Sequence, residues 1–79
     1  MDAMELAKLQ AYLRSRFNDP ALEVRARPNK DDSAEVYIND EFVGVLFKDE
    51  DEGEVSYDFN MAILEIDLPE EQAALVLSE

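Results

Sequence analysis

Apolar and polar residues alternate through the middle of the chain in a pattern that predicts β-strands. Apolar side chains recur at every second position in the series Tyr57, Phe59, Met61 and Ile63. This period of two is typical of a strand with one buried side and one side in water. The preceding run, residues 41–48, carries apolar side chains on both of its faces, as a central strand does.

Two turns are expected to join these strands, and each turn determines which residues lie opposite one another. Asn39 and Asp40 tolerate the backbone conformations of a two-residue hairpin turn. The acidic loop at residues 49–53 is expected to be centred on Asp51. The first turn predicts three pairs: Tyr37 with Phe42, Val36 with Val43, and Ala34 with Val45. The second predicts three more: Phe47 with Val55, Val45 with Tyr57, and Val43 with Phe59. Both hairpins then place the same residues on one face, and a slip of one residue would turn a whole row of side chains over.

The N-terminal part of the chain has the period of a helix. Apolar residues follow one another at spacings of three and four: Leu6, Leu9, Leu13 and Phe17. This spacing predicts an amphipathic helix over residues 2–17. Asp2 is the expected N-cap, with Glu5 three places later as in a capping box. The Asn-Asp-Pro sequence at residues 18–20 ends the helix.

A first, short strand is expected at residues 22–27, where apolar and charged residues alternate. The loop that follows places Arg25 opposite Glu35, as an ion pair on the solvent side of the sheet. The other expected pairs are Val24 with Val36 and Leu22 with Ile38. One face of the sheet then carries the predicted core, which consists of Leu22, Val24, Ala26, Ala34, Val36, Ile38, Val43, Val45, Phe47, Val55, Tyr57, Phe59, Met61 and Ile63.

Together these elements predict an α+β fold. An N-terminal helix packs on one face of a four-stranded antiparallel β-meander, and a short C-terminal helix follows, in the order α-β-β-β-β-α. Residues 1–79 are expected to form one small domain, because a chain of this length has no room for a second core. Residues 69–79 are expected to form the C-terminal helix or a frayed tail.

The charge of the chain is strongly negative and unevenly distributed. The net charge is −13, from 20 acidic and 7 basic residues. Six bases and four acids lie in residues 1–30, a balance of +2, whereas residues 31–79 hold one base and sixteen acids, a balance of −15. Such a surface repels nucleic acids and anionic membranes and attracts cations or basic proteins. Acidic side chains also simply keep a small protein in solution.

Most catalytic and cofactor chemistry lacks its usual residues here. The chain contains no histidine and no cysteine, which removes the common general base, the thiol nucleophile and most transition-metal sites. With two glycines, no glycine-rich phosphate loop is possible. We therefore expect no enzymatic activity and no cofactor. The absence of cysteine fits a cytoplasmic location, and the N-terminus shows neither a signal peptide nor a membrane span.

The acidic run at residues 49–54 has two possible interpretations. Oxygen ligands from Asp49, Asp51 and Glu52 would suit weak association with a divalent cation, but the spacing does not match an EF-hand loop. The simpler interpretation is a solvated hairpin loop.

Tyr37, Phe42 and Leu46 are predicted to lie on the sheet face opposite the core. Exposed aromatic residues are typical anchors of protein interfaces. Two interpretations remain open at this stage. Either these residues bind a protein partner or a second copy, or the C-terminal segment at residues 64–77 folds back over them. An edge strand of so small a sheet also offers a place for strand addition.

Four stretches of the chain resemble a known family: LQAYLR, RPNKDDSAEVYI, DEFVGVLF and YDFNMAIL. They are similar to a family of short, uncharacterised acidic alphaproteobacterial proteins classed as a domain of unknown function. The resemblance covers residues 6–68 and leaves the C-terminal tail outside. It implies a bacterial cytosolic protein and supplies no catalytic residues.

The sequence therefore favours a non-catalytic protein-interaction module, which uses the face of Tyr37, Phe42 and Leu46 or an edge strand and can associate with itself. The alternative is an acidic adaptor or nucleic-acid mimic that binds a basic protein surface. Nucleic acids and membranes are not expected as partners.

Overall fold

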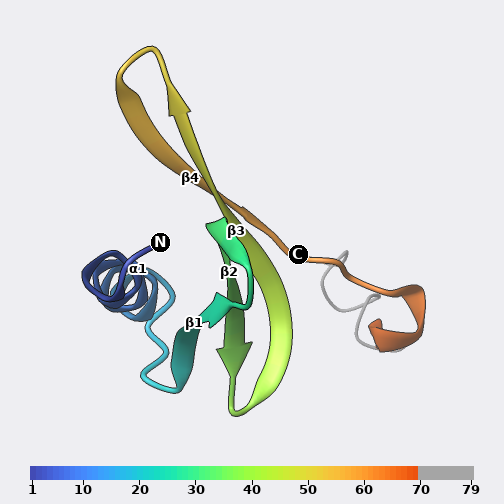
Figure 1. Ribbon diagram of the computed structural model, residues 1–79. Coiled ribbons are helices and arrows are strands. Elements are labelled where there is room, and N and C mark those ends of the chain that lie inside the picture. Colours follow the sequence, from blue (N-terminus) through green and yellow to red (C-terminus); the bar gives the residue numbers. More distant parts are fainter. Residues whose placement is uncertain (70–79) are drawn as a thin grey trace.

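The computed structural model describes residues 1–69 and consists of one helix, a four-stranded sheet and a short 3-10 turn (Figure 1). The elements are α1 (Ala3–Arg16), β1 (Leu22–Arg27), β2 (Lys30–Ile38), β3 (Glu41–Asp51), β4 (Glu54–Asn60) and η1 (Glu65–Asp67). The strands are antiparallel in the order β1-β2-β3-β4. The predicted helix and four-stranded meander are confirmed. The C-terminal helix predicted at residues 69–79 falls almost wholly outside the described residues.

Helix α1 begins and ends close to the predicted residues. The side chain of Asp2 accepts a hydrogen bond from the backbone N–H of Glu5 at 2.7 Å, which satisfies one of the free donors at the helix start. Arg14 and Arg16 lie in the last turn, where cations favour the negative end of the helix. Asn18 then adopts a left-handed backbone with φ of 52° and turns the chain toward β1.

The register of β1 against β2 is as predicted, but the expected ion pair between Arg25 and Glu35 does not form. Arg25 lies opposite Glu35, yet its guanidinium contacts Glu23 at 2.5 Å and Asp40 at 2.6 Å instead. Glu23 is two positions away on the same strand face, and Asp40 lies in the next turn. Both carboxylates are therefore within easier reach than the residue across the strand.

The turn between β2 and β3 is also as predicted, but a β-bulge follows it. Asn39 and Asp40 both have positive φ, 53° and 65°, and Tyr37 lies opposite Phe42. The register then shifts between Val36 and Tyr37, so that Val36 lies opposite Gly44 rather than Val43. The extra residue turns over every later side chain of β3.

The turn between β3 and β4 is shorter than predicted. Glu52 and Gly53 form a two-residue turn, with φ of 53° and 81°, and both strands continue through the acidic run. The paired residues are Val45 with Asn60, Leu46 with Phe59, Phe47 with Asp58, and Lys48 with Tyr57. The predicted loop centred on Asp51 was wrong, because a Glu-Gly pair suffices to close the hairpin.

These two changes redistribute the predicted core. The buried hydrophobic residues are Leu13, Leu22, Val24, Ala34, Val36 and Leu46, with Ile38, Val43 and Phe59 packed against them. Several predicted core residues lie elsewhere: Ala26, Phe47, Val55, Met61 and Ile63 are exposed, and Val45 is half-buried on the other face. The confirmed part of the core is its centre under α1. The errors lie at Ala26 near the end of β1, beyond the bulge in β3, at the start of β4 and in the residues that follow it.

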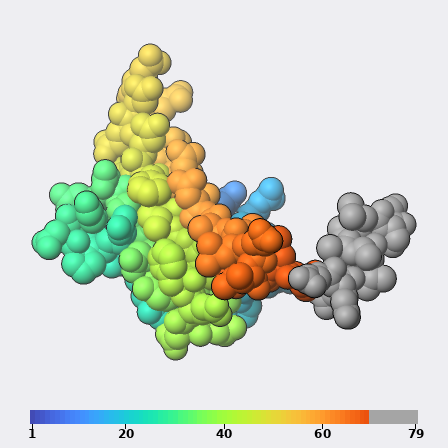
Figure 2. Space-filling model, turned by 90° about the vertical axis from the view of Figure 1, so that its right-hand side faces the viewer, coloured from blue at the N-terminus to red at the C-terminus, as the bar shows by residue number. Residues whose placement is uncertain are grey.

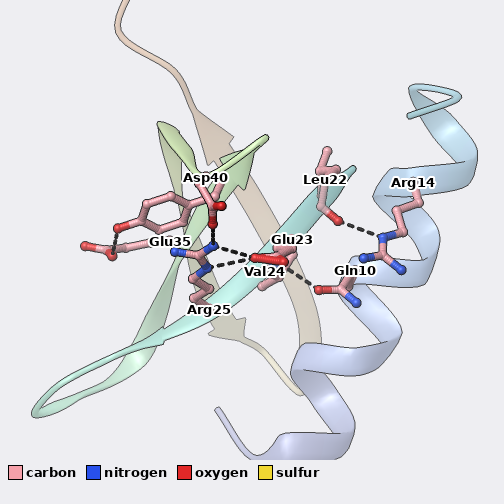
Figure 3. A network of polar contacts seen from close by, with 9 residues as sticks. Gln10, Arg14, Leu22, Glu23, Val24, Arg25, Glu35 and Asp40 are labelled. Carbon is pink, nitrogen blue, oxygen red and sulfur yellow. Dashed lines mark hydrogen bonds and ion pairs between the residues drawn. The ribbon is translucent and has the colours of Figure 1, made fainter. Parts of the chain in front are cut away.

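Two side chains of α1 protect the outer edge of β1 (Figure 3). The side-chain oxygen of Gln10 accepts a hydrogen bond from the Val24 N–H at 3.0 Å, and Arg14 Nε donates to the Leu22 carbonyl at 2.7 Å. An unpaired strand edge would expose these groups to another chain. The helix thus blocks one edge of the sheet and leaves β4 as the other.

Within residues 1–69, no helix has the length and apolar character needed to cross a membrane.

Candidate interaction surfaces

The face of the sheet turned away from α1, called here the outer face, carries the predicted aromatic pair. The rings of Tyr37 and Phe42 meet edge to face, with their centroids 5.7 Å apart and an interplanar angle of 75°. Phe42 is 52% exposed, whereas Tyr37 is half-buried. The predicted cross-strand contact between these two residues is confirmed.

Tyr37 is held by two charged side chains of the outer face, Arg25 and Glu35, which Figure 3 labels. The Arg25 guanidinium lies 4.0 Å from the centroid of the Tyr37 ring, a cation–π arrangement. The Tyr37 hydroxyl donates to Glu35 at 2.9 Å, and this hydrogen bond raises the pKa of the phenol. Hydrogen bonds to Glu23 and then to Asp40 raise the pKa of Arg25. Tyr37 is therefore held in position by contacts within its own domain.

Leu46 does not lie on this face, which corrects the third predicted site residue. It is 2% exposed and belongs to the core under α1, because the bulge after Phe42 shifts the alternation of β3 by one residue. Val45 and Phe47 take its place on the outer face. A shallow hollow lies beside them, lined by Phe42, Gly44, Val45, Phe47, Asn60, Met61 and Ala62.

We call the apolar part of this face the outer patch; it consists of Tyr37, Phe42, Val45, Phe47 and Met61. Phe47 is 41% exposed and Met61 is 55% exposed. The sequence pattern predicts both Val45 and Phe47 in the core, so it does not place them on this face. The Glu52-Gly53 pair was the available signal, since glycine at the second place of a two-residue turn favours a tight hairpin.

A second apolar surface lies on the opposite side of the sheet, between α1 and the β3–β4 hairpin. This helix groove has a volume of about 570 Å³ and is lined by Glu5, Lys8, Leu9, Tyr12, Leu13, Arg16, Phe17, Leu46, Tyr57 and Phe59. Helix α1 packs mainly on β1, so it does not cover β4. Tyr12 and Phe17 stay exposed as a result, although Phe17 meets Phe59 edge to face at 6.3 Å.

Two polar residues of the helix groove, Glu5 and Tyr57, form a cluster with Lys48. The Glu5 carboxylate lies 2.7 Å from the Lys48 ammonium and accepts a hydrogen bond from the Tyr57 hydroxyl. The contact with Lys48, followed by that with Tyr57, lowers the pKa of Glu5. The same contacts raise the pKa of Lys48 and of Tyr57. This cluster ties the start of α1 to both strands of the hairpin.

The chain after β4 carries apolar side chains that stand in solvent. Residues 61–68, called here the arm, leave the sheet on the side opposite α1 (Figure 1). Figure 2, which views the molecule from that side, shows the arm in front of β3. Its large apolar residues are all exposed, and Ile66 is 88% exposed: Met61, Ile63, Leu64, Ile66 and Leu68.

The acidic hairpin, residues 49–54, projects from one end of the molecule (Figures 1 and 2). All of its side chains are exposed. Across residues 1–69, no group of three or more acidic side chains is placed to hold a metal ion. The weak cation association predicted for Asp49, Asp51 and Glu52 stays a prediction, as does the absence of enzymatic activity.

Comparison with known proteins gives one result. Residues 5–67 match a family described as "Protein of unknown function (DUF3126)". Neither a curated protein nor a solved structure matches the chain.

Proposed function

The chain belongs to this family, DUF3126, and since the family description assigns no function, we propose from the geometry that the protein is a non-catalytic protein-interaction module. Its binding surface is the outer patch. The observation that carries the proposal is the exposure of Phe42, Phe47 and Met61 on a sheet face that the helix leaves uncovered.

The outer patch has the residue types and the rigidity that interfaces use. Clustered exposed aromatic and Met side chains on a soluble surface are typical of binding sites. Tyr37 is already fixed by Arg25 and Glu35, so little side-chain entropy is lost when a partner covers it. The exposed ring of Phe42 supplies the apolar anchor beside it.

The proposed binding site differs from the predicted one, which consisted of Tyr37, Phe42 and Leu46. In the proposed site, Phe47 takes the place of Leu46. Strand addition at a sheet edge is restricted to β4, because Gln10 and Arg14 cover the edge of β1. Self-association through the outer patch or through β4 belongs to the same proposal, as does a cytoplasmic location in a bacterium.

The proposal is tested by affinity capture from the native host with the wild-type chain and with the double variant Phe42→Ser, Phe47→Ser. The exposed residue Val55 on β4, which lies outside the outer patch, provides the matched control Val55→Ser. We expect the double variant to lose a partner that both the wild type and the control retain. If the double variant and the control recovered every partner equally, binding through the outer patch would be refuted.

The acidic hairpin supports a second candidate function, an acidic adaptor or nucleic-acid mimic. The hairpin backbone extends beyond the rest of the domain (Figure 1) and its acidic side chains are exposed, so a basic protein surface can reach them without contacting the rest of the sheet. Exposed ion pairs are screened by salt, whereas apolar contacts are not. A complex that dissociates in moderate salt and persists in the Phe42→Ser, Phe47→Ser variant would favour this second function.

A further inference from the structure

The arm has an apolar surface that its own domain does not bury. Leu64, Ile66 and Leu68 are 56%, 88% and 55% exposed, and none of them packs against the hydrophobic core. Acidic residues separate them, Glu65 and Asp67. The arm is therefore apolar and negatively charged at the same time.

The helix groove has the same apolar character, and its charged lining carries two bases, Lys8 and Arg16, against one acid, Glu5, which is already paired with Lys48. Leu9, Tyr12 and Phe59 line it, and the basic side chains of Lys8 and Arg16 stand at its margin on α1. Only seven bases are present in a chain of net charge −13, so two of them beside one apolar groove mark the part of the surface that attracts an acidic segment.

The arm does not reach the groove of its own chain. The pairing of Asn60 with Val45 fixes the end of β4 against β3, and the arm departs from there on the side of the sheet opposite α1 (Figure 1). The groove and the arm of one molecule thus lie on different sides of the sheet. An arm that fills a helix groove comes from another molecule.

We propose that the arm of one copy binds in the helix groove of a second copy, and that the exchange is reciprocal in a two-fold symmetric dimer. Leu64, Ile66 and Leu68 of the arm cover Tyr12 and Phe17. Glu65 and Asp67 approach Lys8 and Arg16. In a reciprocal exchange both grooves are filled and both arms are buried, so the assembly stops at two chains. This interface uses residues 64–68 and the helix groove, none of which belongs to the outer patch, so it does not depend on the proposed function.

Charge reversal on each side of the interface tests the proposal with the full chain. The groove-reversed variant carries Lys8→Glu and Arg16→Glu, and the arm-reversed variant carries Glu65→Lys and Asp67→Lys. Each variant alone brings like charges together, so its dimerisation in sedimentation equilibrium should weaken by roughly tenfold or more. An equimolar mixture of the two variants pairs opposite charges at both contacts and should recover a heterodimer.

Several results of this experiment would overturn the proposal. A wild-type chain that stays monomeric at every concentration would do so, because it would show that no second arm occupies the groove. Dimerisation of both variants at wild-type strength would do so as well. A mixture that forms no heterodimer, while circular dichroism shows both variants folded, would also refute it.

Cysteine cross-linking supplies a second measurement that needs no change of charge. The chain has no cysteine, so a protein with Tyr12→Cys mixed with one carrying Ile66→Cys can form only the introduced disulfides. We expect a covalent heterodimer from this pair and much less from Val55→Cys with Ile66→Cys. Equal cross-linking of the two pairs would contradict the proposal that the arm binds in the groove. The Phe42→Ser, Phe47→Ser variant should still dimerise, which separates this inference from the proposed function.

Discussion

The carboxylate of Glu5 on α1 lies 2.7 Å from the ammonium of Lys48 on β3. The two residues are far apart in sequence, and Tyr57 on β4 donates a hydrogen bond to the same carboxylate. Three elements therefore meet at one ionised group, which also lines the helix groove.

Stability should fall on acidification because of this cluster. The contacts of Glu5 hold its pKa below the ordinary value of 4.5, so they stabilise the fold above that pH and their contribution is lost as pH falls through the lower, folded value. Urea unfolding between neutral and acid pH measures the effect. The variant Glu5→Gln should be less stable near neutral pH and lose less stability on acidification, unlike the exposed control Glu41→Gln. An unchanged acid dependence in Glu5→Gln would contradict this role.

The same cluster predicts a loss of stability at high pH. The pKa values of Lys48 and Tyr57 are raised above 10.5 and 10.0. A raised pKa contributes stability below the unfolded value, and the contribution is lost as pH rises through the folded value. The wild type should therefore lose stability above about pH 10, and Tyr57→Phe should lose less. A spectrophotometric titration of the tyrosines checks the upward shift directly.

Gly44 is required where β4 crosses close to β3. A Cβ atom there would lie 2.5 Å from the Asn60 carbonyl oxygen and 2.6 Å from the Phe59 ring, and the backbone oxygen cannot move aside easily. Gly44→Ala should reduce the free energy of unfolding by roughly 1–3 kcal/mol. A Cβ atom at Gly53 would contact no other atoms, but the residue has a positive φ, which alanine rarely adopts. We therefore expect Gly53→Ala to reduce the free energy of unfolding by only about 1 kcal/mol. Equal stability of Gly44→Ala and the wild type would show that β4 does not cross there.

Removal of the edge protection of β1 should both destabilise the protein and promote association. Gln10→Ala leaves the Val24 N–H without its side-chain acceptor, at a cost of about 1–3 kcal/mol if water cannot replace it. Faster hydrogen exchange of the Val24 amide would report the loss at that site. The exposed helix residue Ser15 provides the control Ser15→Ala, which should leave that amide as slow as in the wild type.

The sequence pattern predicts the turn between β2 and β3 but not the bulge that follows it. Asn39 and Asp40 predict a two-residue turn, and this alone places Tyr37 beside Phe42. The pattern could not reveal the bulge, because Val43 and Val45 are as apolar as Phe42 and Leu46, and either row could face the core. The signal that favours Leu46 lies further along the chain, in the Glu52-Gly53 turn, which pairs Leu46 with Phe59.

The contacts of α1 were harder to predict, since they depend on where the helix lies over the sheet. Leu13 was correctly placed against the sheet, but its neighbour Phe17 remains half in solvent because the helix packs on β1 rather than β4. Nothing in the local sequence marks Gln10 and Arg14 as caps for a strand edge. These contacts depend on tertiary packing, and no repeat in the local sequence predicts them.

The outer patch exists only if Leu46 rather than its neighbour Phe47 faces the core, and one pair of unfolding measurements tests this. Leu46 is 2% exposed and Phe47 is 41% exposed. In urea unfolding, Leu46→Ala should lose roughly 2–5 kcal/mol and Phe47→Ala less than about 1 kcal/mol. The reverse order, with Phe47→Ala the more damaging change, would place Phe47 in the core and remove the outer patch.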